Sequence, residues 1–267
     1  MMSNPAGAGA ADSLSVQTLD SGVVTITFNR PDRLNAIDWD LYRGFVETLE
    51  DIARDTSIPA VVISGAGRAF CAGGDISFMR QMYEREIDKA EVQQLQVRFF
   101  RTQMGMPAPT IAVVNGPAVG LGCTFALSCD LIYASARAKF SDPHVQMGLV
   151  PGDGGALLWP ALVGPGKAKE LLFTGDALTA EEAHRLGLIN HLLPEDELYS
   201  AALAFAERLA RGPRETIQAI KSLTNQATRA LSEHFIRAGL AMESVSQESE
   251  YHHRAVDAFL SGKPVRF

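Results

Sequence analysis

The residue with the clearest chemical potential is Asp153, in the stretch GLVPGDGGALL (148–158), with glycines on both sides and a proline two residues before it. Two opposing effects act on the pKa of a buried carboxyl at the start of a helix: loss of solvent raises the pKa, and the helix dipole lowers it. Such a group can act as a base at neutral pH. Asp is also a common N-cap residue, so Asp153 equally fits as the cap of the helix that begins GGALLWP.

Two glycine clusters, AGGDI (72–76) and GLGCTF (120–125), each lie where a strand and turn lead into a helix. A helix N-terminus carries unpaired N–H groups and partial positive charge, and glycine lets a ligand oxygen approach the backbone closely. Two such N–H groups that converge would form an oxyanion hole. Taken singly, each cluster also fits a tight turn. A dinucleotide-binding fingerprint is excluded for GLGCTF because the third glycine and the following acidic residue are missing.

The segments that must position these residues alternate between strands and helices. Apolar, β-branched runs predict strands, and the helix expected at 38–55 places its apolar residues on one stripe. Strands are expected at 23–28, 60–64, 110–114 and 130–135, and further helices at 75–104 and 121–128. This order predicts βαβ units and an α/β fold with a largely parallel sheet. An echo between the segments that begin at Pro59 and Pro109 indicates two successive turns of one spiral.

This pattern divides the chain into three parts. Residues 1–14 are expected to form a flexible tail, 15–193 an α/β core, and 194–267 a helical region that packs on its own core or on a neighbouring subunit. Within the later part, TAEE is typical of a capping box. The remaining expected elements are a short extended segment at 189–193 and helices at 201–210, 216–230 and 232–260.

The composition limits the possible partners. A net charge of −7 and a pI of about 5.4 argue against a nucleic-acid-binding surface. Three cysteines without a CxxC pair fit a reduced, cytoplasmic setting. The first residues lack the features of a signal peptide, and no apolar run of roughly 18 residues predicts a membrane span. Neither nucleic acid nor a membrane is therefore expected as a partner, although local basic residues could still hold a small phosphorylated ligand.

Five ordered motifs cover nearly the whole chain after residue 14. They are RPDRLNAID (30–38), GRAFCAGGDI (67–76), AVVNGPAVGLGCTFALSCDLIYAS (112–135), GLVPGDGGALLWPALVG (148–164) and AKELLFTGDALTAEEAHRLGLINHLLP (168–194). Together they resemble the crotonase family, the enoyl-CoA hydratases and isomerases. The resemblance implies a crotonase-like spiral of ββα turns with a helical C-terminal region, assembled as a homotrimer or a dimer of trimers. It also implies an acyl-CoA substrate, no tightly bound cofactor, and a thioester enolate held by two backbone N–H groups.

The resemblance assigns these two amides to Gly74 and Leu121. Many members have glycine at the position of Leu121, but the contributing group is the backbone amide, so the leucine is expected only to narrow the space beside the thioester. Contacts with coenzyme A carry over to Arg33, Ala36, Ala72, Asp75 and Ile76. Phe259 and Lys263 match more loosely and would reach the CoA of a neighbouring subunit. On residue type alone, Arg33 and Lys263 fit solvated surface charge equally well.

At the catalytic positions the chain departs from the family. The hydratases use two glutamates, which correspond here to Thr124 and to His144 in SDPHVQ. Thr124 has no useful pKa, whereas His144 would titrate near neutral pH or serve as an ordinary hydrogen-bonded residue. Asp153 matches the position where double-bond isomerases have a proton-transferring aspartate and a dehalogenase has a nucleophile. Asp153 is therefore the expected catalytic carboxylate.

The expected function is double-bond isomerisation or hydration of an enoyl-CoA, with Asp153 as the base. One alternative is a dehalogenase or thioester hydrolase in which Asp153 is a nucleophile. Another is a non-catalytic CoA-binding oligomer that has lost the family's glutamates. The histidines at 184, 191, 252 and 253 show no metal-ligand spacing, so no metal is expected.

Overall fold

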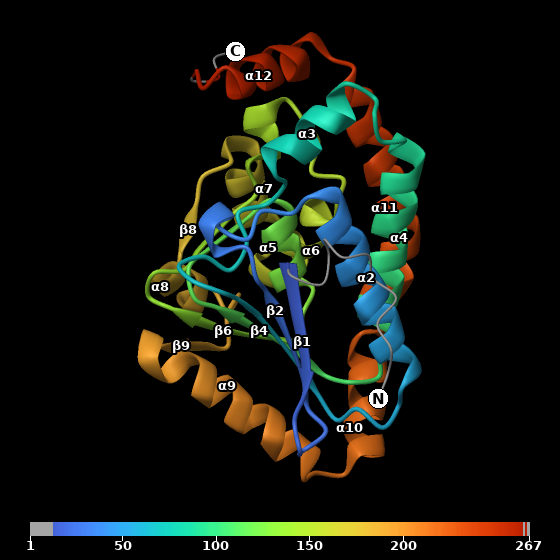
Figure 1. Ribbon diagram of the computed structural model, residues 1–267, viewed down its shortest axis with the longest axis vertical. Coiled ribbons are helices and arrows are strands. Elements are labelled where there is room, and N and C mark those ends of the chain that lie inside the picture. Colours follow the sequence, from blue (N-terminus) through green and yellow to red (C-terminus); the bar gives the residue numbers. More distant parts are fainter. Residues whose placement is uncertain (1–12, 264, 266–267) are drawn as a thin grey trace.

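The structure is a computed structural model that describes residues 13–263 and 265 (Figure 1). A six-stranded sheet lies at its centre, in the order β1 (Leu14–Thr18), β2 (Val24–Phe28), β3 (Val61–Gly65), β4 (Thr110–Val114), β6 (Leu131–Ser135) and β9 (His191–Leu193). All neighbouring strands pair in parallel except β1 and β2, so the prediction of a largely parallel sheet is confirmed. Leu14 begins a strand rather than ending a tail, and residues 1–12 of the expected tail lie outside the described residues.

A second, three-stranded sheet, which the sequence did not predict, contains β5 (Pro117–Val119), β7 (Lys139–Ser141) and β8 (Leu178–Thr179). Its strands are too short to show a period-2 pattern. A parallel bridge joins Cys71 to Ala118, and Val61 pairs with Thr110 in the large sheet. The segments that begin at Pro59 and Pro109 therefore lie side by side, as expected for two successive turns of a spiral.

The helices follow the expected order with one main correction. They are η1 (Pro31–Arg33), α2 (Trp39–Arg54), α3 (Ile76–Tyr83), α4 (Lys89–Gly105), α5 (Leu121–Leu127), η2 (Pro143–Met147), α6 (Gly155–Val163), α7 (Pro165–Thr174), α8 (Ala180–Arg185), α9 (Glu195–Ala210), α10 (Arg214–Thr224), α11 (Gln226–Gln247) and α12 (Glu250–Leu260). The single helix expected at 75–104 is wrong. Arg85 adopts φ 59° after α3, and Asp88 caps the N-terminus of α4 by accepting a hydrogen bond from the Ala90 amide. The C-terminal segment likewise breaks at Asn225 and between Gln247 and Glu250.

Both faces of the large sheet are covered, which explains why its inner strands lack alternation. Helix α9 packs on one face, where Leu198, Ala202 and Ala206 meet Val62 and Ile111. Helices α2, α4 and α5 belong to the larger core on the opposite side, and Figure 1 shows α9 on the far side of the sheet from α2 and α4. Among the described residues, no helix combines the length and apolar character that a membrane crossing requires.

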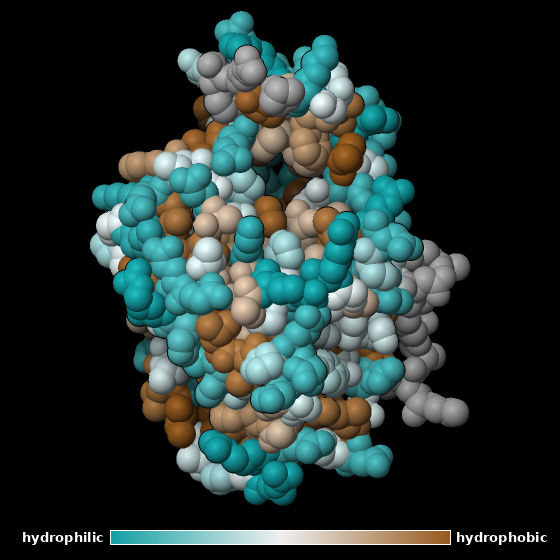
Figure 2. Space-filling model, turned by 90° about the vertical axis from the view of Figure 1, so that its left-hand side faces the viewer, coloured by the Kyte–Doolittle hydropathy of each residue, from teal (hydrophilic) through white to brown (hydrophobic). Residues whose placement is uncertain are grey.

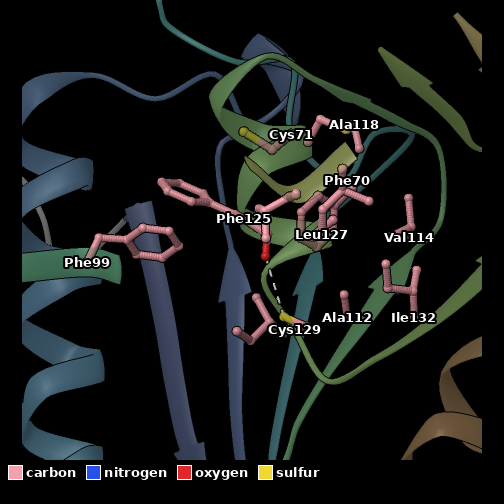
Figure 3. Packing of buried hydrophobic residues seen from close by; sticks show 14 of the residues in the cluster. Phe70, Cys71, Phe99, Ala112, Val114, Ala118, Phe125, Leu127, Cys129 and Ile132 are labelled. Carbon is pink, nitrogen blue, oxygen red and sulfur yellow. Dashed lines mark hydrogen bonds between the residues drawn. The ribbon is translucent and has the colours of Figure 1, made fainter. Parts of the chain in front are cut away.

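Phe125, on α5, is the centre of an aromatic cluster in this larger core. Its ring lies within 4.8–6.0 Å, centroid to centroid, of the rings of Phe28, Tyr42, Phe45 and Phe99. Figure 3 shows Phe125 between Phe99 on one side and Phe70 and Leu127 on the other. Because α5 also carries Leu121 and Thr124, this cluster fixes the position of two predicted site residues.

Candidate active site

A cavity of about 990 Å³ lies below α12 and α3. Figure 2 shows the surface hollowed just below the top of the molecule, with apolar side chains around the opening. Its wall contains the predicted site residues Ala72, Gly74, Leu121, His144, Asp153 and Phe259. A volume of this size is at the upper end of the range for small-molecule pockets. Residues from separate predicted motifs are thus brought together in one place.

The two predicted oxyanion amides both lie on the cavity wall. Leu121 is the first residue of α5, where backbone N–H groups have no partner within the helix. At the bridge between Ile37 and Gly74, the hydrogen bonds use Gly73 and Asp75 instead, with N–O distances of 2.7 and 2.8 Å. This leaves the Gly74 amide available for a substrate oxygen.

Asp153 lies in a turn that only glycine can complete. Gly154 adopts φ +119°, and a Cβ added there would lie 2.1 Å from the Phe100 ring. Gly154 is the N-cap of α6 and makes no side-chain cap. Asp153, just before it, accepts a hydrogen bond from the Gly155 amide through Oδ1 at 3.3 Å. Only Oδ1 of Asp153 therefore acts as a helix cap, and Oδ2 is left for other contacts.

Oδ2 of Asp153 is directed at the two residues that replace the family's glutamates. Thr124 Oγ1 donates a hydrogen bond to it at 3.3 Å, and His144 Nε2 lies 3.8 Å away. Thr124 is 1% exposed and does not line the cavity, so its hydroxyl contacts Asp153 from the protein side. Burial raises the pKa of Asp153, and the charge of His144 opposes the rise. A buried carboxylate with a raised pKa is suited to proton transfer near neutral pH.

His144 is part of an Asp142–His144–Asp153 relay. Nδ1 of His144 makes a close hydrogen bond with Asp142, while Nε2 faces Asp153. Burial alone would lower the pKa of His144, but the charges of Asp142 and Asp153 raise it well above its ordinary value. The three side chains are close enough to hold a metal ion. Because both ring nitrogens of His144 already face carboxylates, the arrangement favours a charged histidine between two acids.

The variant His144→Gln is expected to remove a pH-dependent stabilisation. The folded pKa of His144 lies above that of the unfolded chain, so its contribution is complete below about pH 6.5 and is lost as pH rises through the folded pKa. The free energy of unfolding of wild type minus that of the variant should therefore be larger at about pH 6 than at about pH 9. Urea denaturation measures it, with the exposed His184→Gln as control. An equal difference at both pH values would contradict the assignment.

The predicted CoA residues on two separate loops lie next to each other. The Ala72 amide donates to the Leu34 carbonyl at 3.0 Å, which joins the segment of Arg33 and Ala36 to that of Ala72, Asp75 and Ile76. Asp75 is 3% exposed and caps α3, and its carboxylate pairs with Arg30 at 3.2 Å. Ile76 and the Arg33 side chain are exposed beside it, at 49% and 64%. The Asp75 side chain thus anchors the loop, and the exposed atoms beside it are free to meet a ligand.

The two C-terminal candidates differ in their relation to the cavity. Phe259, on α12, lines the cavity of its own chain and is 38% exposed. The sequence had assigned Phe259 to a neighbour's CoA, and in the single chain it contributes to the wall above Asp153. Lys263 is exposed after the end of α12 and does not line the cavity.

Four residues near Asp153 were missed by the sequence. Gln96 on α4 donates a hydrogen bond to the Asp153 carbonyl. Tyr42 on α2 and Glu243 on α11 line the cavity, and Asp142 holds His144. Of these, only Asp142 carried a sequence signal, since it stands two residues before His144 in a motif already selected.

Comparisons of this sequence with a family model and with known proteins point to the same family. The sequence model described as "Enoyl-CoA hydratase/isomerase" matches residues 18–267. The chain is 36% identical to the "Short-chain-enoyl-CoA hydratase" of Clostridium acetobutylicum over 83% of each protein. It is 31% identical to the "1,2-epoxyphenylacetyl-CoA isomerase" of Escherichia coli, over 93% of this chain and 96% of that protein.

A solved structure supports the same relationship. The enoyl-CoA hydratase/isomerase from Mycobacterium paratuberculosis superposes with a TM-score of 0.88 and 33% sequence identity. The superposition covers 93% of this chain and 99% of that one. The motif resemblance is therefore confirmed by sequence and by fold, and the chain is a member of the enoyl-CoA hydratase/isomerase family, the crotonase superfamily.

Proposed function

We propose that this acyl-CoA-processing enzyme moves the double bond of a 3-enoyl-CoA to the 2-position, with Asp153 as the base. The observation that carries the proposal is the placement of a buried carboxylate in the same cavity as two backbone amides. Asp153, Gly74 and Leu121 all lie on its wall. The family's glutamates are absent at Thr124 and His144, so Asp153 is the carboxylate left at a matched catalytic position.

The reaction begins at the carbon next to the thioester. The Asp153 carboxylate removes a proton from C2, and the electron pair moves onto the thioester oxygen, where the Gly74 and Leu121 amides bind it. A proton is then added at C4, the carbonyl re-forms, and the double bond lies between C2 and C3. His144 and Thr124 hold the orientation of Asp153 throughout.

No metal or cofactor is required by these steps, so removal of metal ions with EDTA is expected to leave turnover unchanged.

Coenzyme A would lie along the joined loops described above. We assign its binding to Arg33, Ala36, Ala72, Asp75 and Ile76, with Phe259 at the cavity and Lys263 beyond α12. We also propose that the chain forms a homotrimer or a dimer of trimers through its C-terminal helices. These helices expose several large apolar side chains, namely Ile220, Leu223, Leu231, Phe235, Met242 and Val245.

Hydration of a 2-enoyl-CoA is the second candidate. It is favoured by the His144 ring beside Asp153, because a histidine–carboxylate pair can activate water and return a proton. Several relatives also carry hydratase names, including the 2,3-dehydroadipyl-CoA hydratase of Escherichia coli, which is 34% identical to this chain.

Exchange in deuterated water separates these functions. Isomerisation of trans-3-hexenoyl-CoA should incorporate deuterium at C4, whereas hydration of trans-2-hexenoyl-CoA should yield the 3-hydroxyacyl-CoA. A nucleophilic Asp153 would instead take up one ¹⁸O atom from labelled water during hydrolysis of an acyl-CoA. Absence of deuterium exchange at C2 with every enoyl-CoA, together with tight CoA binding, would show a non-catalytic oligomer and refute the proposal.

A further inference from the structure

Glu243, on α11, lines the same cavity as Asp153, although about 90 residues separate them in the sequence. The residue is partly buried, and its Oε2 atom is fully buried beside Gly152, whose amide favours the carboxylate, with no well-formed hydrogen bond among the described residues. Buried carboxylate oxygens are normally satisfied by the protein, by water or by a ligand. Glu243 therefore places a carboxyl with one unsatisfied oxygen on the wall of the cavity, next to the turn that carries Asp153.

The packing of α11 against the catalytic turn fixes the position of Glu243. The backbones meet at Gly152 and Gly239, where a Cβ added to Gly152 would lie 2.3 Å from the Gly239 carbonyl oxygen and 2.9 Å from Glu243 Oε2. One helical turn after Glu243, Ser246 Oγ accepts a hydrogen bond from the Val150 amide at 3.1 Å. Contacts on both sides thus hold the carboxyl beside the turn that carries Asp153.

Glu243 shares the electrostatic environment of Asp153. Burial raises the pKa of Glu243 to about 7, the charges of Asp153 and Asp142 add to the rise, and His144 opposes it. Burial also raises the pKa of the Tyr42 hydroxyl, and the charges of Asp153 and Glu243 raise it further, so Tyr42 lies near both. A carboxylic acid of this kind can hold a proton at neutral pH and release it during turnover.

We propose that Glu243 is a second catalytic residue, the general acid that protonates the enoyl chain at C4 after Asp153 has removed the proton from C2. This inference rests on the proposed function and names the proton donor for its second step. Asp153 ends the cycle as the carboxylic acid and Glu243 as the carboxylate. The substrate gains one proton at C4, loses one at C2 and keeps its charge. Exchange with water then returns each carboxyl to its starting state.

The other charged and titratable groups that line the cavity come from several elements. Tyr42 lies on α2, and His144 lies on η2 and is held by Asp142. The rest are Tyr83, Arg85, Lys89, Glu248, His252 and His253. These groups are the same in every variant compared below, so a difference between the pH profiles of two variants reports on Glu243.

The test uses the full chain and trans-3-hexenoyl-CoA. Glu243→Gln should lower kcat about 100-fold, because it removes a general acid, while exchange of the C2 proton with deuterated water continues within about threefold of wild type. Wild-type kcat should fall as pH rises above about 7, where Glu243 loses its proton, and this basic limb should vanish in the variant. Glu243→Asp keeps a carboxylic acid but places it farther from the substrate. Its kcat should therefore be about tenfold higher than that of Glu243→Gln.

A label placed at C2 distinguishes two proton-transfer groups from one. In wild type, deuterium from C2 should appear in water, and the C4 hydrogen should come from solvent. In Glu243→Gln, Asp153 still exchanges the C2 proton while protonation at C4 is slow, so the ratio of deuterium release to product formation should rise about 30-fold over wild type. Glu250→Gln makes the same chemical change at an exposed position at the start of α12 and should behave like wild type.

Three results would overturn the inference, and they are distinguishable. Wild-type turnover and pH profile in Glu243→Gln would refute the role of Glu243 and leave the proposed function intact. Parallel loss of C2 exchange and turnover in that variant would show that Glu243 supports the fold of the site rather than donating a proton. No C2 exchange in wild type would refute the proposed function itself, and this inference with it.

Discussion

The variant Asp153→Asn should lose about 1,000-fold in turnover of trans-3-hexenoyl-CoA and should show no exchange of the C2 proton. The amide has nearly the shape of the carboxylate: its oxygen can accept the hydrogen bond from the Gly155 amide, and its NH2 group can donate one to the Thr124 hydroxyl, but it cannot take a proton from carbon. Initial rates and exchange in deuterated water provide the measurement. Because the lost interaction exists only during proton transfer, kcat should fall and KM should change little.

Binding and a matched variant separate catalysis from folding in this experiment. Hexanoyl-CoA, which has no double bond to move, should bind Asp153→Asn and wild type with dissociation constants equal within about twofold. The exposed Asp176→Asn should keep full activity. Full activity of Asp153→Asn would show that another group is the base.

The largest expected effect on stability comes from Phe125→Ala. Phe125 is 1% exposed and contacts aromatic rings from β2, α2 and α4, so its removal leaves a cavity that rigid neighbours cannot fill. The free energy of unfolding should fall by about 3–5 kcal/mol. Urea denaturation followed by circular dichroism measures it. Activity should also fall, because Thr124 precedes Phe125 on α5 and orients Asp153.

Phe173→Ala is the matched control, since this ring is 72% exposed at the end of α7. Its loss should change the free energy of unfolding by no more than about 0.5 kcal/mol. A loss below about 1 kcal/mol for Phe125→Ala would mean that the cluster repacks around the smaller side chain.

The parts of the fold that the sequence predicted correctly are those with strong local signals. The β-branched runs of β2, β3 and β4 and the apolar stripe of α2 are local patterns that each predict their own element. The break between α3 and α4 could not be predicted, because YEREID (83–88) contains neither Gly nor Pro, although Arg85 adopts positive φ there. The strands of the small sheet exist only through pairing between distant segments.

The residues of the candidate site that belong to sequence motifs could be predicted, and those outside the motifs could not. Gly74, Leu121, His144 and Asp153 come from four such stretches, and the spiral brings all of them to one cavity. Glu243 stands in a helical segment whose sequence, GLAMESVSQ, resembles any amphipathic surface helix. Its proposed role depends on a backbone contact between α11 and the turn that carries Asp153, which no local pattern encodes.

The close approach of Gly152 and Gly239 has a consequence for how the protein matures on the ribosome. The turn that carries Asp153 can form early, but one wall of its cavity is supplied by α11, which begins at Gln226. A nascent chain that ends before this helix would leave Asp153 in an open, hydrated groove. The burial that raises the pKa of Asp153 is therefore completed late in synthesis, when the last helices dock and exclude water from the turn.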